Sequence, residues 1–190
     1  MKKRIIIFMA MFFTASLVFA QKSSFNKGDK VLNLGLGLGS TLYSGSYYTS
    51  KIPPISVSYE VGLRDNLIDV DNLNLGIGGY LGYSSSRYEA AWGTSTYGWN
   101  YSYMILGIRG SLHYPLVDKL DTYAGLMLGY NIVSSKKFGD WSGAMMSASN
   151  SSMAFAFYLG GRYYINDKFG VMAELGYGIA YLNIGVALRL

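Results

Sequence analysis

Strict alternation of apolar with polar or small residues constrains this chain most. In the segment 31–43, apolar side chains occupy nearly every even position and small or polar ones occupy most of the odd positions; the even leucines are Leu32, Leu34, Leu36, Leu38 and Leu42. Side chains of a β-strand point alternately to its two faces, so one face of this segment is apolar. Repeated over many segments, such alternation is typical of a transmembrane β-barrel, whose outer face contacts lipid.

Eight segments of the chain follow this pattern. They are residues 31–43, 54–63, 73–84, 101–114, 121–133, 153–165, 169–177 and 181–190, and none places a charge on its apolar face. Most are close to the roughly 9–11 residues that a tilted membrane-spanning strand needs. The sequence therefore predicts an all-β fold, an eight-stranded antiparallel up-and-down transmembrane β-barrel formed by a single domain over residues 21–190. We expect the barrel to be closed, with residues 31–41 paired to 181–190, because unpaired backbone groups in lipid are costly.

The first twenty residues differ in character from the rest. Basic residues at positions 2–4 precede an apolar stretch from Ile5 to Phe13, and Val18-Phe19-Ala20 then offers small residues at the positions that a signal peptidase reads. This order is typical of a secretory signal peptide, and the stretch is shorter than the roughly 20 residues of a spanning helix. We predict that residues 1–20 are a cleaved signal peptide. Three of the 16 basic residues lie within it, so the mature chain carries 13 basic and 11 acidic residues, a balance that does not favour nucleic-acid binding.

The connections between segments alternate in length. Residues 64–72, 115–120 and 166–168 are compact and polar, whereas residues 44–53, 85–100 and 134–152 are longer and rich in Ser, Tyr, Gly and Trp. Outer-membrane barrels have short periplasmic turns and longer extracellular loops. We therefore assign the short links to the periplasm and the three long links to the cell surface, with a tight fourth surface turn near Gly178.

Four charged residues fall on the inward face of their strands: Glu60, Arg109, Arg162 and Glu174. Each lies a similar number of residues from the periplasmic end of its strand, so we expect one layer of two positive and two negative groups. Because the interior of an eight-stranded barrel is just wide enough for side chains, these charges must pair. The same residues could form a structural plug or a gate. We predict a plug in which Arg162 pairs with Glu174 on the neighbouring strand.

The two faces also predict opposite responses to charge. Leu128 points to lipid in this register, so we expect Leu128→Arg to cost about 2–4 kcal/mol, the value at the bilayer midplane. Met127 points inward, and we expect Met127→Arg to behave differently because it enters a polar lumen.

Tyrosine and tryptophan gather toward the extracellular ends of the segments. Aromatic girdles at the membrane interface account for many of them, but Trp92 and Trp141 lie in the centres of long links. Aromatic residues in loops are frequent contact residues for proteins and sugars, although they can equally be buried under the loop itself. We consider Trp92 and Trp141 candidate loop contacts.

The whole mature segment, with its eight alternating strands and a last strand that ends the sequence at Leu190, resembles the small outer-membrane barrels of the OmpA/OmpX type. It is more similar to the broad "outer membrane protein β-barrel domain" family common in Bacteroidetes-like Gram-negative bacteria. The resemblance implies an outer-membrane location and recognition of the C-terminal strand by the barrel-assembly machinery. Members usually end in an aromatic residue, whereas this sequence ends in leucine.

Signals for catalysis, cofactors or metals are weak. The Gly35–Gly39 run has Ser40 where a dinucleotide loop has its third glycine, and we interpret these glycines as space for a narrow lumen. A single His gives no multi-histidine metal site. Ser111 and His113 share a face, as in outer-membrane lipid A hydrolases, but they point inward near the periplasmic end, away from lipid A. We therefore expect no catalytic, cofactor or metal site.

These observations predict a non-enzymatic outer-membrane barrel that presents aromatic-rich extracellular loops, with a role in surface interaction or envelope integrity. Its expected partners are outer-membrane lipids and an extracellular protein or glycan. A narrow channel for small solutes and a lipid A modifying enzyme are the alternatives. A soluble lipocalin-type barrel would need a polar exterior, which the leucine-rich face contradicts.

Overall fold

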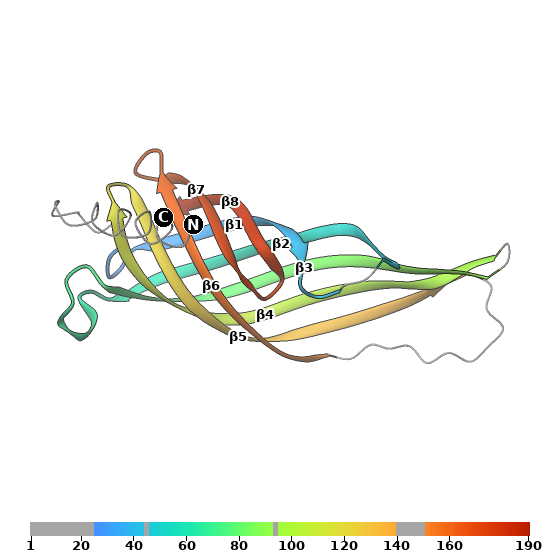
Figure 1. Cartoon of the computed structure of the whole chain (residues 1–190). Helices are drawn as coiled ribbons and strands as arrows, with labels where there is room; N and C mark the ends of the chain where they lie inside the picture. Colours follow the sequence, from blue (N-terminus) through green and yellow to red (C-terminus); the bar gives the residue numbers. More distant parts are fainter. Residues whose placement is uncertain (1–24, 44–45, 93–94, 140–150) are drawn as a thin grey trace, which may run out of the picture.

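The computed structural model describes residues 25–43, 46–92, 95–139 and 151–190, and in these residues eight strands form a closed antiparallel barrel (Figure 1). The strands are β1 (Lys30–Ser40), β2 (Tyr48–Arg64), β3 (Asn74–Trp92), β4 (Ser95–Val117), β5 (Leu120–Phe138), β6 (Ser152–Tyr164), β7 (Phe169–Tyr177) and β8 (Ala180–Arg189). One short 3-10 helix, η1 (Leu67–Asp69), lies between β2 and β3. Among the described residues, no helix is long and apolar enough to cross a membrane.

The first and last strands close the barrel. β1 pairs antiparallel with β8, from Val31 opposite Arg189 to Ser40 opposite Ala180. This ladder confirms the predicted pairing of residues 31–41 with 181–190. Within the closed part of the barrel there is no sheet edge, so each strand there has hydrogen-bond partners on both sides, as a lipid environment requires.

The outer face of the barrel is apolar. Leu126 is 69% exposed and Ile108 is 65% exposed, whereas Arg162 on the inner face is fully buried. A large apolar side chain left this exposed is unfavourable in water but suits contact with lipid chains. The predicted faces are confirmed along most of each strand, and the outward side chains form an apolar belt around the barrel.

Two predicted orientations are wrong, and both lie beside the β7–β8 turn. Leu42, expected to face lipid, packs instead against buried apolar residues of the lumen. Near the end of β1, Gly39 has a φ of +69°, which interrupts the alternation of side chains between the two faces. Tyr181, expected to face inward, is 56% exposed, because its neighbour Ala180 turns into the lumen.

The strands are much longer on one side of the barrel than on the other. β3, β4 and β5 have 19, 23 and 19 residues, whereas β7 and β8 have 9 and 10. In Figure 1, β3, β4 and β5 project far beyond the β7–β8 turn. Much of the predicted surface links 44–53, 85–100 and 134–152 is therefore β-strand. The lipid-facing alternation ends with the membrane, but the backbone ladder continues into water, where polar and aromatic side chains can occupy both faces.

Inward glycines make room for the side chains that fill the lumen. A Cβ at Gly160 would lie 2.5 Å from the ring of Tyr123, and one at Gly125 would lie 2.4 Å from the hydroxyl of Tyr158. Both distances are far below van der Waals contact. In the Gly35–Gly39 run, a Cβ at Gly37 would lie 2.6 Å from the Cβ of Ala180, so the interpretation of these glycines as space in a narrow lumen is confirmed there.

Candidate functional sites in the lumen and on the extracellular sheet

All four predicted interior charges are buried and paired, and their contacts form two groups rather than one layer. The lower charge group contains Glu60, His113, Asp121 and Arg162. Arg162 donates to Asp121 Oδ2 at 3.0 Å and also to Glu60 Oε2. His113 bonds to the same two carboxylates, with Nδ1 2.8 Å from Asp121 Oδ1 and Nε2 3.2 Å from Glu60 Oε1. The two carboxylates thus alternate with the two basic side chains. The four residues come from four different strands.

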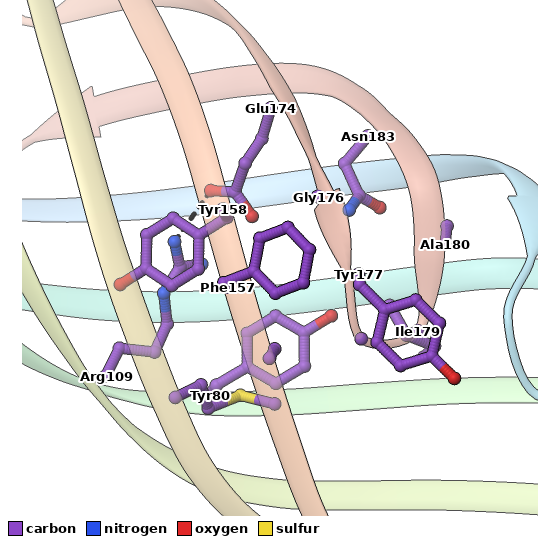
Figure 2. A pocket seen from close by; sticks show the side chains of 13 residues that line it. Tyr80, Arg109, Phe157, Tyr158, Glu174, Gly176, Tyr177, Ile179, Ala180 and Asn183 are labelled. Carbon is purple, nitrogen blue, oxygen red and sulfur yellow. Dashed lines mark hydrogen bonds and ion pairs between the residues drawn. The ribbon is translucent and has the colours of Figure 1, made fainter.

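The second group is an upper ion pair between Arg109 and Glu174. Arg109 donates to Glu174 Oε2 at 2.6 Å (Figure 2). The hydroxyl of Tyr123 donates to the same oxygen at 3.1 Å. The guanidinium carbon of Arg109 also lies 3.8 Å from the centre of the Tyr158 ring. The predicted pairing of Arg162 with Glu174 is wrong. Arg162 reaches two closer carboxylates, including Asp121 opposite it on β5, and Glu174 is taken by Arg109.

An N-terminal segment, residues 25–29, closes the periplasmic end of the lumen. Phe25 is fully buried, and its ring stacks on His113 with 4.0 Å between ring centroids. Asn74 donates to the Phe25 carbonyl at 2.6 Å, and the Gly28 amide donates to the Gly62 carbonyl at 2.9 Å. The sequence analysis missed this segment because it precedes the first alternating strand and has no period of its own.

Around and above the upper ion pair, an apolar cluster fills the lumen: Tyr80, Ile105, Tyr123, Met127, Tyr158, Ile179 and Ala180. Met127 points inward as predicted and is 5% exposed; it packs in this cluster, opposite Arg109 on β4. A cavity of about 20 Å³ lies between this cluster and Glu174. Figure 2 shows Arg109, Tyr80 and Ile179 around this space. About one water molecule fits such a volume.

The arrangement of Ser111 and His113 does not form a nucleophile–base pair. Both ring nitrogens of His113 bond to carboxylates, and the Ser111 hydroxyl lies 2.9 Å from the hydroxyl of Tyr158. Phe25 covers one face of the His113 ring. Within the part of the chain that the structure describes, no three His, Cys, Asp or Glu side chains are placed to hold a metal ion.

An aromatic array lies on the projecting strands β2, β3 and β4 and on the chain after β1. It occupies the face of the sheet that continues the inner face of the barrel. It contains Tyr43, Tyr47, Tyr48, Tyr88, Trp99, Tyr101 and Tyr103. Each ring lies within 6.2 Å, centroid to centroid, of at least one other; the closest pair is Tyr48 and Tyr88 at 5.1 Å. Tyr103 at the base is buried, whereas Tyr47 is 63% exposed. The array thus runs from the top of the filled lumen to the surface.

The sequence analysis singled out two other aromatic residues as candidate loop contacts. Of the two candidate loop contacts, Trp141 lies outside the described residues, and of Trp92 only the backbone, at the end of β3, is described. Asp121 was also missed as a member of the charge groups. Its position on β5 was enough to predict that it points inward, because alternation places it on the same face as Tyr123 and Met127.

The fold resembles solved outer-membrane barrels. The outer membrane protein OprG of Pseudomonas aeruginosa matches with a TM-score of 0.52 and 9% identity over 89% of this chain and 99% of that one. Ail, the attachment invasion locus protein of Yersinia pestis, matches in complex with the heparin analogue sucrose octasulfate, with a TM-score of 0.49 and 13% identity over 86% and 95% of the two chains. The N-terminal β-barrel domain of Pseudomonas aeruginosa OprF has a TM-score of 0.43 and 12% identity over 87% and 98%. No family model and no curated protein matches the sequence.

The OprG likeness and the apolar belt agree on the kind of barrel. The fold is that of small outer-membrane barrels, and the outer face of this chain is apolar where such barrels meet lipid. The protein has the fold of an eight-stranded transmembrane β-barrel of the outer-membrane type.

Proposed function

We propose that this protein is a non-enzymatic surface-contact barrel, whose extended strands hold the aromatic array above the outer membrane to bind an extracellular protein or glycan. The observation that carries the proposal is the array itself, seven neighbouring rings supported by a continuous sheet. Aromatic side chains, Tyr and Trp above all, dominate the contact energy of many binding surfaces.

The chemistry of the array suits contact with a partner. Tyrosine and tryptophan combine a large apolar face with a polar group and lose little conformational entropy on binding. Part of the array serves the sheet itself, because a sheet outside the membrane needs an apolar face for stability. The partly exposed rings of Tyr48, Tyr88 and Trp99 remain accessible for a ligand, beside the more exposed Tyr47.

The filled lumen favours a scaffold over a channel. The N-terminal segment, the lower charge group, the upper ion pair and the apolar cluster follow one another from the periplasmic end, leaving a cavity of only about 20 Å³ beside the upper pair. An enzymatic role is disfavoured by the engagement of His113 with two carboxylates. We also infer kinship with the OmpA/OmpX-like family of Bacteroidetes-like bacteria, on the pattern of alternation and the terminal strand.

The test is a binding assay with matched aromatic removals. Purified protein in nanodiscs is screened against immobilised glycans and extracellular matrix proteins, and each ligand found is tested with the Tyr88→Ala/Trp99→Ala variant. The control, Tyr114→Ala/Tyr163→Ala, removes two exposed rings near the periplasmic end. We expect the array variant alone to lose binding at least tenfold. Equal binding by both variants, or no ligand for the wild type, contradicts the proposal.

Conductance separates the scaffold from a channel. We expect wild-type protein in planar bilayers to show no steady current, because side chains of the described residues fill the lumen around the two charge groups. A steady, porin-like conductance would support the narrow channel instead. Mass spectrometry of lipid A from cells with and without the protein tests the enzyme alternative, and we expect identical spectra.

A further inference from the structure

The outer side of the extracellular sheet differs from the aromatic array behind it. Along β3, β4 and β5 the highest apolar residues of the belt are Tyr83, Met104 and Ile132, which are register partners. The next outward residues form a row of three serines, Ser85, Ser102 and Ser134. Two residues further up, Arg87, Asn100 and Lys136 face one another across the three strands. This last row lies about 10 Å above the apolar belt, at the level of lipid headgroups.

A third cation joins this row from β2. Lys51 reaches across β3, the strand of Arg87, and its Nζ donates to Asn100 Oδ1 at 3.1 Å. Asn100 therefore has Arg87 on one strand beside it, Lys136 on the other, and the Lys51 ammonium bonded to its side chain. We refer to Lys51, Arg87, Asn100 and Lys136 as the basic row.

The basic row holds more positive than negative charge. Among the described residues, the one carboxylate paired with a member of the row is that of Glu89, which Arg87 Nε engages at 2.8 Å. Phe138 lies under the same guanidinium, whose carbon is 3.8 Å from the ring centre. Arg87 is thus held in place from two sides, and its terminal nitrogens make no hydrogen bond to any described residue. Cations on neighbouring strands repel one another, and an anion bound among them would relieve that repulsion.

An apolar groove begins below the end of the basic row that lies on β2 and β3. It runs over the outer face of β8, β1, β2 and β3, and its lining includes Leu34, Leu36, Val57, Leu81 and, at its upper edge, Ile55 and Tyr83. Ile55 is four residues from Lys51 on β2, and Tyr83 is four residues from Arg87 on β3. The groove has a volume of about 460 Å³. Cations above an apolar groove on one membrane-facing surface match a molecule with an anionic head and acyl chains.

We propose that the basic row and the groove below it bind a phosphorylated lipid of the outer leaflet. The phosphate is bound by Lys51, Arg87 and Lys136, and the acyl chains lie along the apolar belt. The row faces sideways toward the membrane, on the opposite side of the sheet from the aromatic array. A headgroup of the surrounding leaflet reaches it without leaving the bilayer, which favours a lipid over a soluble phosphate. The site is independent of any ligand of the array.

The test compares three probes on the detergent-solubilised, folded barrel by native mass spectrometry. Short-chain phosphatidic acid carries both phosphate and acyl chains, phosphatidylcholine lacks the net charge, and inorganic phosphate lacks the chains. We expect phosphatidic acid to bind most tightly, and its binding to weaken when NaCl is raised to 1 M. Tighter or equal binding of inorganic phosphate overturns the lipid assignment, and equal binding of phosphatidylcholine overturns the role of charge.

Matched variants locate the site. We expect Lys51→Gln/Arg87→Gln/Lys136→Gln to bind phosphatidic acid about 100-fold more weakly, since each cation near a membrane surface contributes roughly fivefold. Two control variants remove a charge elsewhere. Lys137→Gln changes the next residue of β5, whose side chain points to the other face of the sheet, and Lys119→Gln changes a residue in the periplasmic turn. Both should bind phosphatidic acid as the wild type does. Heat-modifiable migration on gels verifies that each variant is folded. Unchanged binding by the folded triple variant, or an equal loss in either control, overturns the proposal.

Discussion

The lumen and the extracellular sheet are built from the same strands, yet they treat charged and aromatic side chains in opposite ways. In the lumen, Arg162 is fully buried between Glu60 and Asp121, and tyrosine rings fill the space that inward glycines leave. On the sheet, Arg87 is 38% exposed, and the rings of the array contact one another at the surface. The difference follows from water, because a buried charge must be paired while an exposed one is already solvated. One region is therefore committed to stability and the other is free for contact.

The largest expected effect tests the buried half of this comparison. Arg162→Ala leaves Glu60 and Asp121 in the lumen without their shared cation, so we expect a loss of about 3–5 kcal/mol in the free energy of unfolding. Urea unfolding in lipid vesicles, followed by fluorescence, measures it. The matched change on the sheet, Arg87→Ala, should cost less than about 1 kcal/mol. Comparable losses for the two arginines would break the distinction between the regions.

A double-mutant cycle sharpens the same point. We expect Arg162→Ala to couple with Glu60→Gln by about 1 kcal/mol or more, and with Glu174→Gln by less than about 0.5 kcal/mol. The reason is that Glu174 bonds to Arg109 and Tyr123 instead. Stronger coupling to Glu174 would restore the pairing that was expected from the sequence.

The next effect lies on the membrane face of β5. Leu128 is 51% exposed to lipid, and Leu128→Arg should cost about 2–4 kcal/mol in the same unfolding assay. Leu116→Arg, at the periplasmic end of β4, should cost about 0–1 kcal/mol because it lies near the interface. Met127→Arg no longer serves as the mild control, since Met127 is buried in the apolar cluster. An equal cost at positions 116 and 128 would show that the apolar belt is misplaced in depth.

A smaller effect is expected at the base of the lumen. In Gly62→Ala the new Cβ would lie 2.0 Å from the Asn26 carbonyl oxygen, so the N-terminal segment must leave its position. We expect a loss of about 1–3 kcal/mol, together with new tryptic cleavage after Lys27. Gly79→Ala on the adjacent strand is the control, because nothing lies within 4 Å of its added Cβ. Resistance of Gly62→Ala to trypsin would mean that the segment adapts without leaving.

The smallest effect on stability belongs to the aromatic array. Trp99→Ala removes a ring 5.9 Å from Tyr88, and we expect a cost of about 0.5–1.5 kcal/mol, typical of an aromatic pair. The same variant should lose most of its ligand binding. A large loss of stability with intact binding would assign the array to folding alone and reverse the comparison.

The fold could be predicted because lipid imposes a period of two on every spanning strand. The register of β5, for example, follows from Leu126, Leu128 and Tyr130 alone. Where lipid ends this constraint ends as well, which is why the extensions of β3, β4 and β5 were read as loops. Neither face of those extensions must be apolar, so their sequence carries no alternation to detect.

The alternation of side chains between the two faces of each strand identified the interior charges but not their partners. Alternation predicts that Arg162 and Glu174 point inward. The tilt of the strands and the length of the side chains decide which carboxylate Arg162 reaches. Phe25 carried no signal, because its position depends on the cavity that the finished barrel leaves between His113 and Arg162. Such contacts depend on three-dimensional closure rather than on any local pattern.

The unequal height of the barrel wall has a mechanical consequence. β3 and β4 are joined by an unbroken ladder from Asn74 opposite His113 to Trp92 opposite Ser95, which spans both the membrane and the projecting sheet. A ligand pulling on the aromatic array along the strands therefore loads many hydrogen bonds in parallel, in shear, instead of opening them one after another. Tension at the tip passes directly into the part of the barrel anchored in lipid, without a flexible joint between them. The tall wall is thus suited to hold a bound object against flow.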